Sequence, residues 1–291
     1  MPELPEVETV RLGLRPVLEG HVITDARIRR RDLRLPFPPR FVERLKGRRV
    51  LSVTRRAKYV LAALDSGETL VIHLGMSGRL SVYTHAKRQR LGDYVYNPAP
   101  DGAGEGKHDH VVFETDAPAR IVFNDHRRFG LMALVATDKL EGDKLFKGIG
   151  IEPLSPSFNA RYLAHALKGK KTPIKSALLD QRVIAGLGNI YVCEALFFAG
   201  ISPKRWAGAV RPNEVKRLAA AIKKVLQEAI AAGGSTLRDH AQATGDPGNF
   251  QHHFRVYGRE GEPCLERKCR GTVKRIVQAG RSTFYCPSCQ K

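Results

Sequence analysis

The residues best placed to do chemistry stand at the start of the chain, in Met1-Pro2-Glu3-Leu4-Pro5-Glu6. Initiator methionine is normally removed when the next residue is small, and Pro2 would then carry a free secondary amine. The pKa of an α-amino group is about 7.7–8.0 against about 10.4 for lysine, so far more of it is neutral at pH 7. Such an amine forms a Schiff base with a carbonyl carbon, and Glu3 beside it can move protons. The segment therefore indicates covalent amine catalysis.

The same residues also fit a plain helix start. Proline is common in a first helical turn, and acidic side chains there are favoured by the helix dipole. Apolar residues recur at helical spacing and predict an amphipathic helix over about 5–18: Val7, Val10, Leu14 and Val17. Glu3 and Glu6 would then lie near one face at its start. These residues alone leave both interpretations open.

A second chemical signature is the cysteine pattern Cys264-x4-Cys269-x16-Cys286-x2-Cys289. Two close thiolate pairs suit one tetrahedral Zn²⁺, and four cysteine ligands leave no open position, so the zinc should be structural. Between the pairs, strands are expected over 272–277 and 282–285 with a turn at 278–281. In an intracellular protein such a cluster favours metal over disulfides. Cys193, alone in an apolar stretch, is expected in the core.

Charge narrows the class of partner. The 291 residues carry 49 Lys+Arg against 29 Asp+Glu, a net charge of +20, and are 42% hydrophobic. A globular protein this basic is expected to bind a polyanion. No apolar run approaches the ~20 residues of a membrane span, and no lipidation signal is present, so nucleic acid is favoured over a membrane. No signal peptide is evident, and we expect an intracellular, cytoplasmic protein.

The pattern of elements predicts an α+β protein. After the first helix, β-rich runs separated by turns predict a sandwich or barrel: 22–28, 49–55, 58–64, 69–74, 110–115 and 119–123. Residues 86–106 are expected to form a long surface loop. Helices are expected over 160–167, 174–180, 190–199 and 212–232. The expected domains are 1–140 and 157–250, joined by a linker over 141–156, with the cysteine ribbon at 251–291.

Several segments in this order resemble the formamidopyrimidine-DNA glycosylase family, bifunctional enzymes that excise oxidised purines such as 8-oxoguanine. They are Pro2–Glu8, Arg56–Tyr59, His73–Gly78, Lys107–His110, Asp125–Gly130, Gly186–Tyr191 and the cysteine ribbon. The resemblance spans the chain. It implies an N-terminal helix with a β-sandwich, then a helix–two-turn–helix domain with a zinc-ribbon hairpin. Its implied partner is double-stranded DNA containing oxidised bases.

The resemblance implies catalytic roles for five residues. Pro2 would attack the sugar C1′ and displace the base, and Glu3 would assist opening of the sugar ring. Glu6 would support that site, although a helix-start acid fits it equally well. Lys58 would donate a proton in β-elimination, the alternative being a surface lysine at a strand start. Arg281, at the ribbon turn, would act in δ-elimination.

The resemblance also implies residues that bind DNA. A flipped base leaves a gap that side chains must fill, and three match the family's wedge: Met76, Arg127 and Phe129. Core packing is the alternative for Phe129. Contact with DNA is implied for His108, and contacts with DNA phosphates are implied for Lys170, Lys175 and Asn189. The segment Ser235–Phe250 would be a lid that is poorly ordered without DNA.

Three features depart from the family pattern: the x4 spacing of the first cysteine pair, His126 in place of a common proline, and a long loop over 82–107. They put the shapes of the ribbon and wedge in question. Two other functions stay open. One is a glycosylase of the sister branch that prefers oxidised pyrimidines, and the other is a non-catalytic zinc-ribbon protein that binds damaged DNA.

Overall fold

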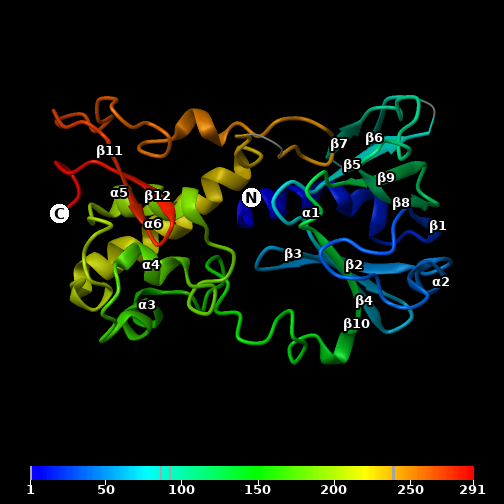
Figure 1. The fold of residues 1–291 in the computed structure, drawn as a ribbon, viewed down its shortest axis with the longest axis horizontal. Coiled ribbons are helices and arrows are strands. Elements are labelled where there is room, and N and C mark those ends of the chain that lie inside the picture. The colour runs from blue at the N-terminus through cyan, green and yellow to red at the C-terminus, as the bar shows by residue number, and fades with distance from the viewer. Residues whose placement is uncertain (1, 86, 92, 238–239) are drawn as a thin grey trace. The chain divides into compact units, whose positions relative to one another are not determined.

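The computed structural model describes residues 2–85, 87–91, 93–237 and 240–291. The chain divides into two compact units. The first contains the residues up to Lys147 together with Ala232–Asn249, and the second contains Gly148–Ala231 together with Phe250–Lys291. The first unit is built on sheets and the second on helices (Figure 1). The domain boundaries expected from sequence stay predictions, and the expected lid lies with the first unit as far as Asn249.

Two four-stranded antiparallel sheets form the framework of the first unit, where the sequence predicted a sandwich or barrel. One has the order β1-β8-β9-β5, with strands Ile23–Ile28, Asp109–Thr115, Ala119–Asn124 and Arg79–Thr84. The other has the order β10-β4-β3-β2, with strands Leu131–Ala136, Glu68–His73, Tyr59–Leu64 and Val50–Arg56. Strand β3 alternates covered and partly covered residues, as expected of a sheet with one face in the core.

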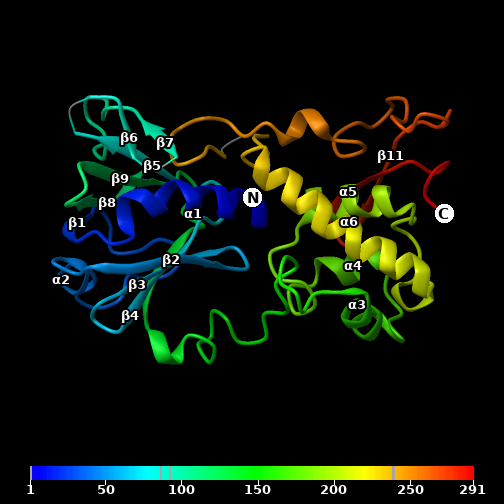
Figure 2. The ribbon, with the colours of Figure 1, turned by 180° about the vertical axis from the view of Figure 1, so that it is seen from behind.

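Helix α1 (Leu4–Leu18) lies between these two sheets (Figure 2). Its apolar residues at helical spacing, among them Val10 and Leu14, share one core with Val53 of β2 and Leu80 of β5. Burial of such side chains stabilises the fold by about 1.5–3 kcal/mol each. The core therefore fixes the position of the helix, and with it the position of the residues at its start.

The second unit contains the helices α3, α4, α5 and α6, which cover Ala160–Leu167, Ile174–Leu179, Asn189–Ala199 and Pro212–Ala231. Almost every residue of α5 is buried, because it packs against α4, α6 and β12. Helix α6 buries one stripe and exposes the opposite face. Across the described residues, no helix combines the length and the apolar character that crossing a bilayer requires.

The ribbon hairpin is tighter than the sequence suggested. Strands β11 (Lys274–Gln278) and β12 (Arg281–Tyr285) pair from Gln278 with Arg281 onward. The turn is therefore the two residues Ala279 and Gly280, both with positive φ of 48° and 71°. Such turns match the natural twist of two antiparallel strands. Arg281 consequently stands at the first position of β12, directly after the turn.

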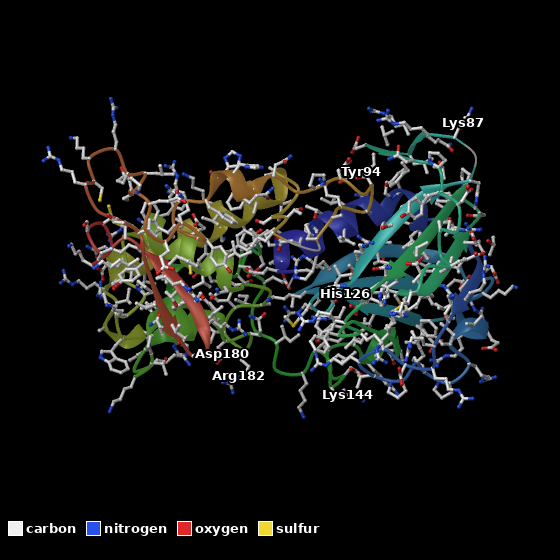
Figure 3. The ribbon with its side chains drawn as sticks, turned by 45° about the horizontal axis from the view of Figure 1, so that its top comes forward. Lys87, Tyr94, His126, Lys144, Asp180 and Arg182 are labelled. Carbon is white, nitrogen blue, oxygen red and sulfur yellow. The ribbon has the colours of Figure 1, made fainter. Side chains whose placement is uncertain are left out.

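The expected surface loop over 86–106 contains a hairpin of β6 (Gln89–Leu91) and β7 (Tyr94–Tyr96), in which Figure 3 labels Tyr94. The loop prediction was wrong here, because strands of three residues leave almost no alternating pattern. Tyr96 is fully buried, and its hydroxyl donates to the carbonyl of Gly13 in α1 (2.6 Å). Sequence patterns also missed β5, β10 and the short helix α2 (Phe41–Leu45). Single 3₁₀ turns cover Thr137–Lys139, Ala207–Ala209 and Phe250–His253.

Candidate active site and DNA-binding surfaces

The start of α1 brings Pro2, Glu3 and Glu6 together in a buried position. The backbone N–H of Glu3 donates to Glu6 Oε2 (2.8 Å). The other oxygen, Glu6 Oε1, accepts the backbone N–H of Ser235 (2.8 Å), at the start of the expected lid. Glu6 is thus more than a helix-start acid, because its carboxyl group connects the residue beside Pro2 to the lid segment.

Lys58 lies in the tight turn between β2 and β3, where Ala57 adopts a left-handed conformation with φ 52°. Only 7% of Lys58 is exposed, so the interpretation as a surface lysine was wrong. Glu8 of α1 holds this part of β2 by accepting from Arg55 Nε (2.9 Å). Burial would raise the pKa of the Glu8 carboxyl, but Arg11 and Arg55 together lower it below its usual value. The ionised Glu8 therefore docks the end of β2 against the first turns of α1.

His73, at the end of β4, was not among the predicted site residues. Its ring packs on Tyr59 with the centroids 4.7 Å apart, and its Nδ1 lies 3.0 Å from the backbone nitrogen of Gly75, whose N–H donates to it. Burial, with contributions from Lys58 and Arg34, lowers the pKa of His73 to about 4. The ring is therefore neutral at physiological pH, with its proton on Nε2. The sequence signal that could have found it is its place at the start of the segment His73–Gly78, which resembles the family.

The three expected wedge residues come together on two adjoining segments, the β4–β5 turn and the β9–β10 loop. A Cβ added to Gly75 (φ 67°) would lie 2.3 Å from the carbonyl carbon of Phe129, so the two backbones touch. Met76 is 38% exposed and Phe129 is 42% exposed, which excludes core packing for Phe129. The Arg127 guanidinium lies 4.8 Å from the Phe129 ring centroid. All three side chains are thus available to a ligand.

His108 lies just before β8 and is partly buried. Its ring centroid is 6.2 Å from that of His126, which Figure 3 labels, and 6.4 Å from that of His110. The departure at position 126 therefore places a second histidine beside the predicted DNA-binding one. In the described part of the chain, the cysteine ribbon is the single group of three or more His, Cys, Asp or Glu side chains arranged to hold a metal ion.

The middle of the lid segment packs within the first unit. Ala243 is buried, and its carbonyl accepts the backbone N–H of Val82 in β5 (2.8 Å). A Cβ added to Gly13 of α1 would lie 2.7 Å from the Ala243 Cβ, so the glycine permits this close approach. The expected lid includes Arg238 and Asp239, which lie outside the described residues. Its ordering on DNA stays a prediction.

In the second unit, Asn189 is the first residue of α5 and follows a turn that needs glycine, since Gly186 has φ 77°. The Gln181 side chain organises this turn by accepting from Gly186 N and donating to Leu187 O (both 2.8 Å). Asn189 Nδ2 donates to the carbonyl of Ser282 (2.9 Å). Its Oδ1 is buried and has no hydrogen-bond partner among the described residues. The predicted phosphate contact is thus held directly against the ribbon hairpin.

Lys170 follows α3, is partly exposed, and accepts the N–H of Gly208 at its carbonyl (3.0 Å). Nearby, Asp180 forms an exposed ion pair with Arg182, and both residues are labelled in Figure 3. Hydrogen bonds from Arg182 lower the pKa of Asp180, with a smaller contribution from the Lys170 charge. Lys170 is therefore partly accessible, and its expected contact with DNA stays a prediction.

Lys175 differs from that expectation. It is fully buried (0% exposed), and its Nζ donates to Thr283 Oγ1 (2.7 Å) and to the carbonyl of Ser282 (3.0 Å). Direct contact with a DNA phosphate is not supported by this geometry. Arg281, the residue just before this pair, is exposed. The lysine therefore holds the strand that presents Arg281.

The four ribbon cysteines fit one zinc ion. Their Sγ atoms lie within 4.8 Å of one another, and the pairs Cys264–Cys289 and Cys269–Cys286 are both 3.7 Å apart. A tetrahedron with Zn–S bonds of about 2.3 Å needs sulfur separations of about 3.8 Å. The x4 spacing is therefore compatible with chelation. A Cβ on Gly271 would lie 2.4 Å from Ser288 Oγ and 2.9 Å from Cys286 Sγ, so a larger residue here would crowd both Ser288 and the cluster. One structural zinc is the cofactor of this protein.

Three sequence profiles match the chain in order. Residues 1–132 match the formamidopyrimidine-DNA glycosylase N-terminal domain, and residues 149–241 match the H2TH domain of the same enzyme. Residues 261–291 match the zinc finger found in FPG and IleRS. The first profile covers most of the sheets and α1, the second covers helices α3 to α6, and the third covers the cysteine ribbon.

Curated relatives match over the whole chain. The formamidopyrimidine-DNA glycosylase of Ruegeria sp. (strain TM1040) is 58% identical over 292 residues and covers 100% of both chains. That of Cereibacter sphaeroides (strain ATCC 17025 / ATH 2.4.3) is 56% identical, also over 100% of both. Identity at this level over full length is shared by proteins of one family.

Solved structures agree. The Lactococcus lactis Fpg in complex with DNA containing an abasic site has a TM-score of 0.83 and 31% identity, and the match covers 99% of each chain. The MutM (Fpg) protein from Thermus thermophilus has a TM-score of 0.81 and 39% identity, over 99% of this chain and 98% of that one. The chain therefore belongs to the formamidopyrimidine-DNA glycosylase family, the DNA glycosylases with abasic-site lyase activity that act in base-excision repair.

Proposed function

We propose that this enzyme excises oxidised purines, namely 8-oxoguanine and formamidopyrimidines, from duplex DNA and cleaves the strand by β,δ-elimination through a Schiff base on Pro2. The observation that carries the proposal is the start of α1, where the carboxyl groups of Glu3 and Glu6 are buried beside Pro2 and the core fixes the helix. Preorganised groups of this kind stabilise developing charge without having to rearrange during the reaction.

In this scheme the Pro2 nitrogen, freed by removal of Met1, bonds to C1′ while the bond to the base breaks. Glu3 protonates the ring oxygen as the sugar opens and the iminium forms. The iminium acidifies C2′, so loss of a C2′ proton expels the 3′ phosphate, with Lys58 supplying the proton that the leaving group needs. A second loss of a proton expels the 5′ phosphate, assisted by Arg281. The zinc ion supports the hairpin that bears Arg281.

DNA binding is proposed to use both units. Extruding a base costs a few kcal/mol, and Met76 and Phe129 would fill the vacated space, as apolar wedges do elsewhere. Arg127 would reach the orphaned cytosine with its planar fork of donors. His108, Lys170 and Asn189 would contact the DNA backbone. Lys175 would act indirectly, through the strand that carries Arg281.

The proposed partner is double-stranded DNA containing oxidised bases, met by one protein monomer in the cytoplasm at the nucleoid. Net charge of +20 favours this polyanion. A Lactococcus lactis relative was solved with a Fapy-dG containing DNA (TM-score 0.83, 31% identity), which supports the oxidised-purine class. One damaged nucleotide requires one active site, so the reaction gives no reason for a dimer.

Borohydride trapping on duplex DNA containing 8-oxoguanine opposite cytosine tests the proposal. We expect a covalent adduct with the wild-type enzyme, a much weaker one with Pro2→Gly, whose terminal amine is primary, and excision strongly reduced in Glu3→Gln. A trapped adduct that persists undiminished in Pro2→Gly would refute the proline nucleophile. A duplex containing thymine glycol tests the substrate class, since faster cleavage of that duplex would place the enzyme in the pyrimidine-specific branch. Binding without any adduct would identify a non-catalytic damage-binding protein.

A further inference from the structure

Asp125 is a fully buried carboxylate (0% exposed) at the base of the loop that bears Arg127 and Phe129. Its Oδ2 accepts the backbone N–H of Gly130 (2.8 Å), and its Oδ1 accepts the backbone N–H of Arg127 (3.3 Å). One carboxylate therefore clamps the backbone on both sides of Phe129.

The same carboxylate reaches the other wedge segment. Ser77 directly follows Met76, is also buried, and donates its hydroxyl to Asp125 Oδ1 (2.6 Å). Ser77 Oγ also lies within hydrogen-bond distance of the Arg127 nitrogen (3.3 Å). A buried polar link therefore joins the turn that bears Met76 to the loop that bears Arg127 and Phe129.

The backbone of Asp125 is fixed as well. Its N–H donates to the carbonyl of His108 (3.0 Å), and its own carbonyl lies 2.8 Å from His110 Nε2. Isolated buried charges are costly, and proteins retain them only where hydrogen bonds compensate for lost water. Here the compensating donors are backbone and hydroxyl groups of the two wedge segments, and the proposed chemistry does not use Asp125.

We infer that Asp125 is a positioning residue that, through Ser77, couples Met76 to Arg127 and Phe129, so that the three side chains enter the duplex as one rigid wedge. The inference rests on the proposed function, because the wedge roles belong to it. Two independent segments would each lose conformational freedom on insertion, whereas a coupled pair has lost it on folding. The coupling should therefore accelerate base extrusion and leave the later chemistry on an opened sugar unchanged.

Two variants distinguish the Ser77–Asp125 hydrogen bond between the segments from the hydrogen bonds that Asp125 makes within its own loop. Ser77→Ala removes the bridge between the segments but leaves both carboxylate bonds within the loop. Asp125→Asn keeps the size and shape of the side chain but replaces one carboxylate oxygen with an NH₂ group. That NH₂ must face the backbone N–H of either Arg127 or Gly130, and two donors cannot form a hydrogen bond with each other. Ser52→Ala, on strand β2 and outside both segments, is the matched control for loss of a serine hydroxyl.

The test compares single-turnover excision of 8-oxoguanine from a duplex with cleavage of an abasic site in a single strand, where no base has to be extruded. Loss of one hydrogen bond to a charged group corresponds to about 10- to 100-fold. We expect a fall of that size for excision in both variants and a change of less than about threefold for single-strand cleavage. Excision within about threefold of wild type in Ser77→Ala, or a parallel fall on both substrates, would overturn the inference.

A measurement that does not depend on catalysis distinguishes failure of this inference from failure of the proposed function. Fluorescence of 2-aminopurine beside a stable abasic analogue rises when a wedge unstacks its neighbours. We expect a smaller rise for Ser77→Ala and Asp125→Asn than for wild type and Ser52→Ala, and equal signals would refute the coupling. Failure of the wild-type enzyme to form a borohydride adduct would instead refute the proposed catalysis, whatever the fluorescence shows.

Discussion

Both units present exposed side chains from tight turns, yet different interactions hold those turns. In the first unit the segments bearing Met76 and Phe129 are held by hydrogen bonds around Asp125 and by a large shared core. In the second unit the turn before Arg281 is held by Lys175 and by four cysteines around a small apolar cluster. A two-stranded hairpin is at best marginally stable alone. The ribbon is therefore stabilised mainly by metal ligation, whereas the sandwich is stabilised mainly by burial of apolar side chains.

Removal of zinc should have the largest effect and should act on the ribbon alone. Binding of structural zinc contributes about 10 kcal/mol or more to the folding of small domains. We expect chelation, or Cys286→Ser, to abolish δ-elimination by disordering the Arg281 turn, and to weaken DNA binding. Gel analysis of the β- and δ-products measures the loss of δ-elimination, and a chromogenic chelator measures the zinc released in parallel.

Thermal unfolding monitored by a fluorophore attached to the first unit provides the control for the zinc experiment. The first unit should keep its transition after chelation, since it contains none of the ligands. A chelated enzyme that still formed δ-product at the wild-type rate would contradict the structural role of the metal. Loss of both transitions together would show that the two anchors are not independent.

Lys175→Met should have the next largest effect. Methionine keeps the apolar stem but leaves Thr283 Oγ1 and the Ser282 carbonyl with one donor fewer, at a cost of about 2–4 kcal/mol for buried polar groups. We expect normal zinc content and a lower ratio of δ- to β-product, because Arg281 is misplaced while Pro2 is untouched. Lys170→Met is the matched control, since that lysine lies at the surface and should alter binding without altering the product ratio.

A Lys175→Met enzyme with a wild-type product ratio but a steeper loss of DNA affinity than Lys170→Met would contradict the positioning role. It would instead support the direct phosphate contact that the sequence resemblance implied. The dependence of affinity on salt discriminates further, because removing one cation from a DNA phosphate lowers the salt slope by about one.

The sequence predicted the sandwich, the helices and the ribbon because each has a strong local signal. Helical spacing in α1, alternation in β3 and the four cysteines are all visible in the sequence. The β6–β7 hairpin was missed because its strands are only three residues long and one of its anchors is a distant contact, that of Tyr96 with Gly13. Such contacts leave no local pattern.

The site was predicted unevenly for the same reason. Pro2, Glu3 and the wedge residues stand out because the family resemblance assigns them roles. The anchors behind them, Asp125 and His73, work through hydrogen bonds to backbone groups brought together only by folding. Lys175 shows the converse, since its type suggests a surface cation whereas the fold buries it against Thr283.

Acid should weaken the first unit through His73. Burial holds the pKa of its ring at about 4 in the folded protein, against 6.5 in the unfolded chain. Between these values the unfolded chain binds a proton that the folded protein does not, so stability falls as the pH drops from 6.5 to 4, by at most about 3–4 kcal/mol. Denaturant unfolding of the first unit at steps across this range measures the slope.

His73→Asn isolates that contribution, because its side-chain oxygen can still accept from Gly75 N–H but does not titrate. The variant should lose less stability than wild type between pH 6.5 and 4, even if it starts from a lower value. Zinc loss at acid pH affects both proteins equally and cancels in the comparison. Parallel pH slopes for the two proteins would show that His73 is not the neutral anchor of the β4–β5 turn.

The smallest effect is expected from a third kind of anchor, the ion pair between Arg205 and Glu214 in the second unit. Both guanidinium nitrogens donate to the carboxylate (2.7 and 2.9 Å) and, with the N–H of Arg211, lower the pKa of Glu214 to about 2. A lowered acid pKa stabilises the fold above the unfolded value of 4.5, and this contribution is lost as the pH falls through 2. Because water still reaches both side chains, which are 23% and 16% exposed, we expect Glu214→Gln to cost no more than about 1 kcal/mol at pH 7, and less in high salt. Denaturant unfolding of wild type and Glu214→Gln in low and high salt measures this loss of stability. A loss above about 1 kcal/mol that does not depend on salt would show that this ion pair stabilises the fold as strongly as the buried anchors do.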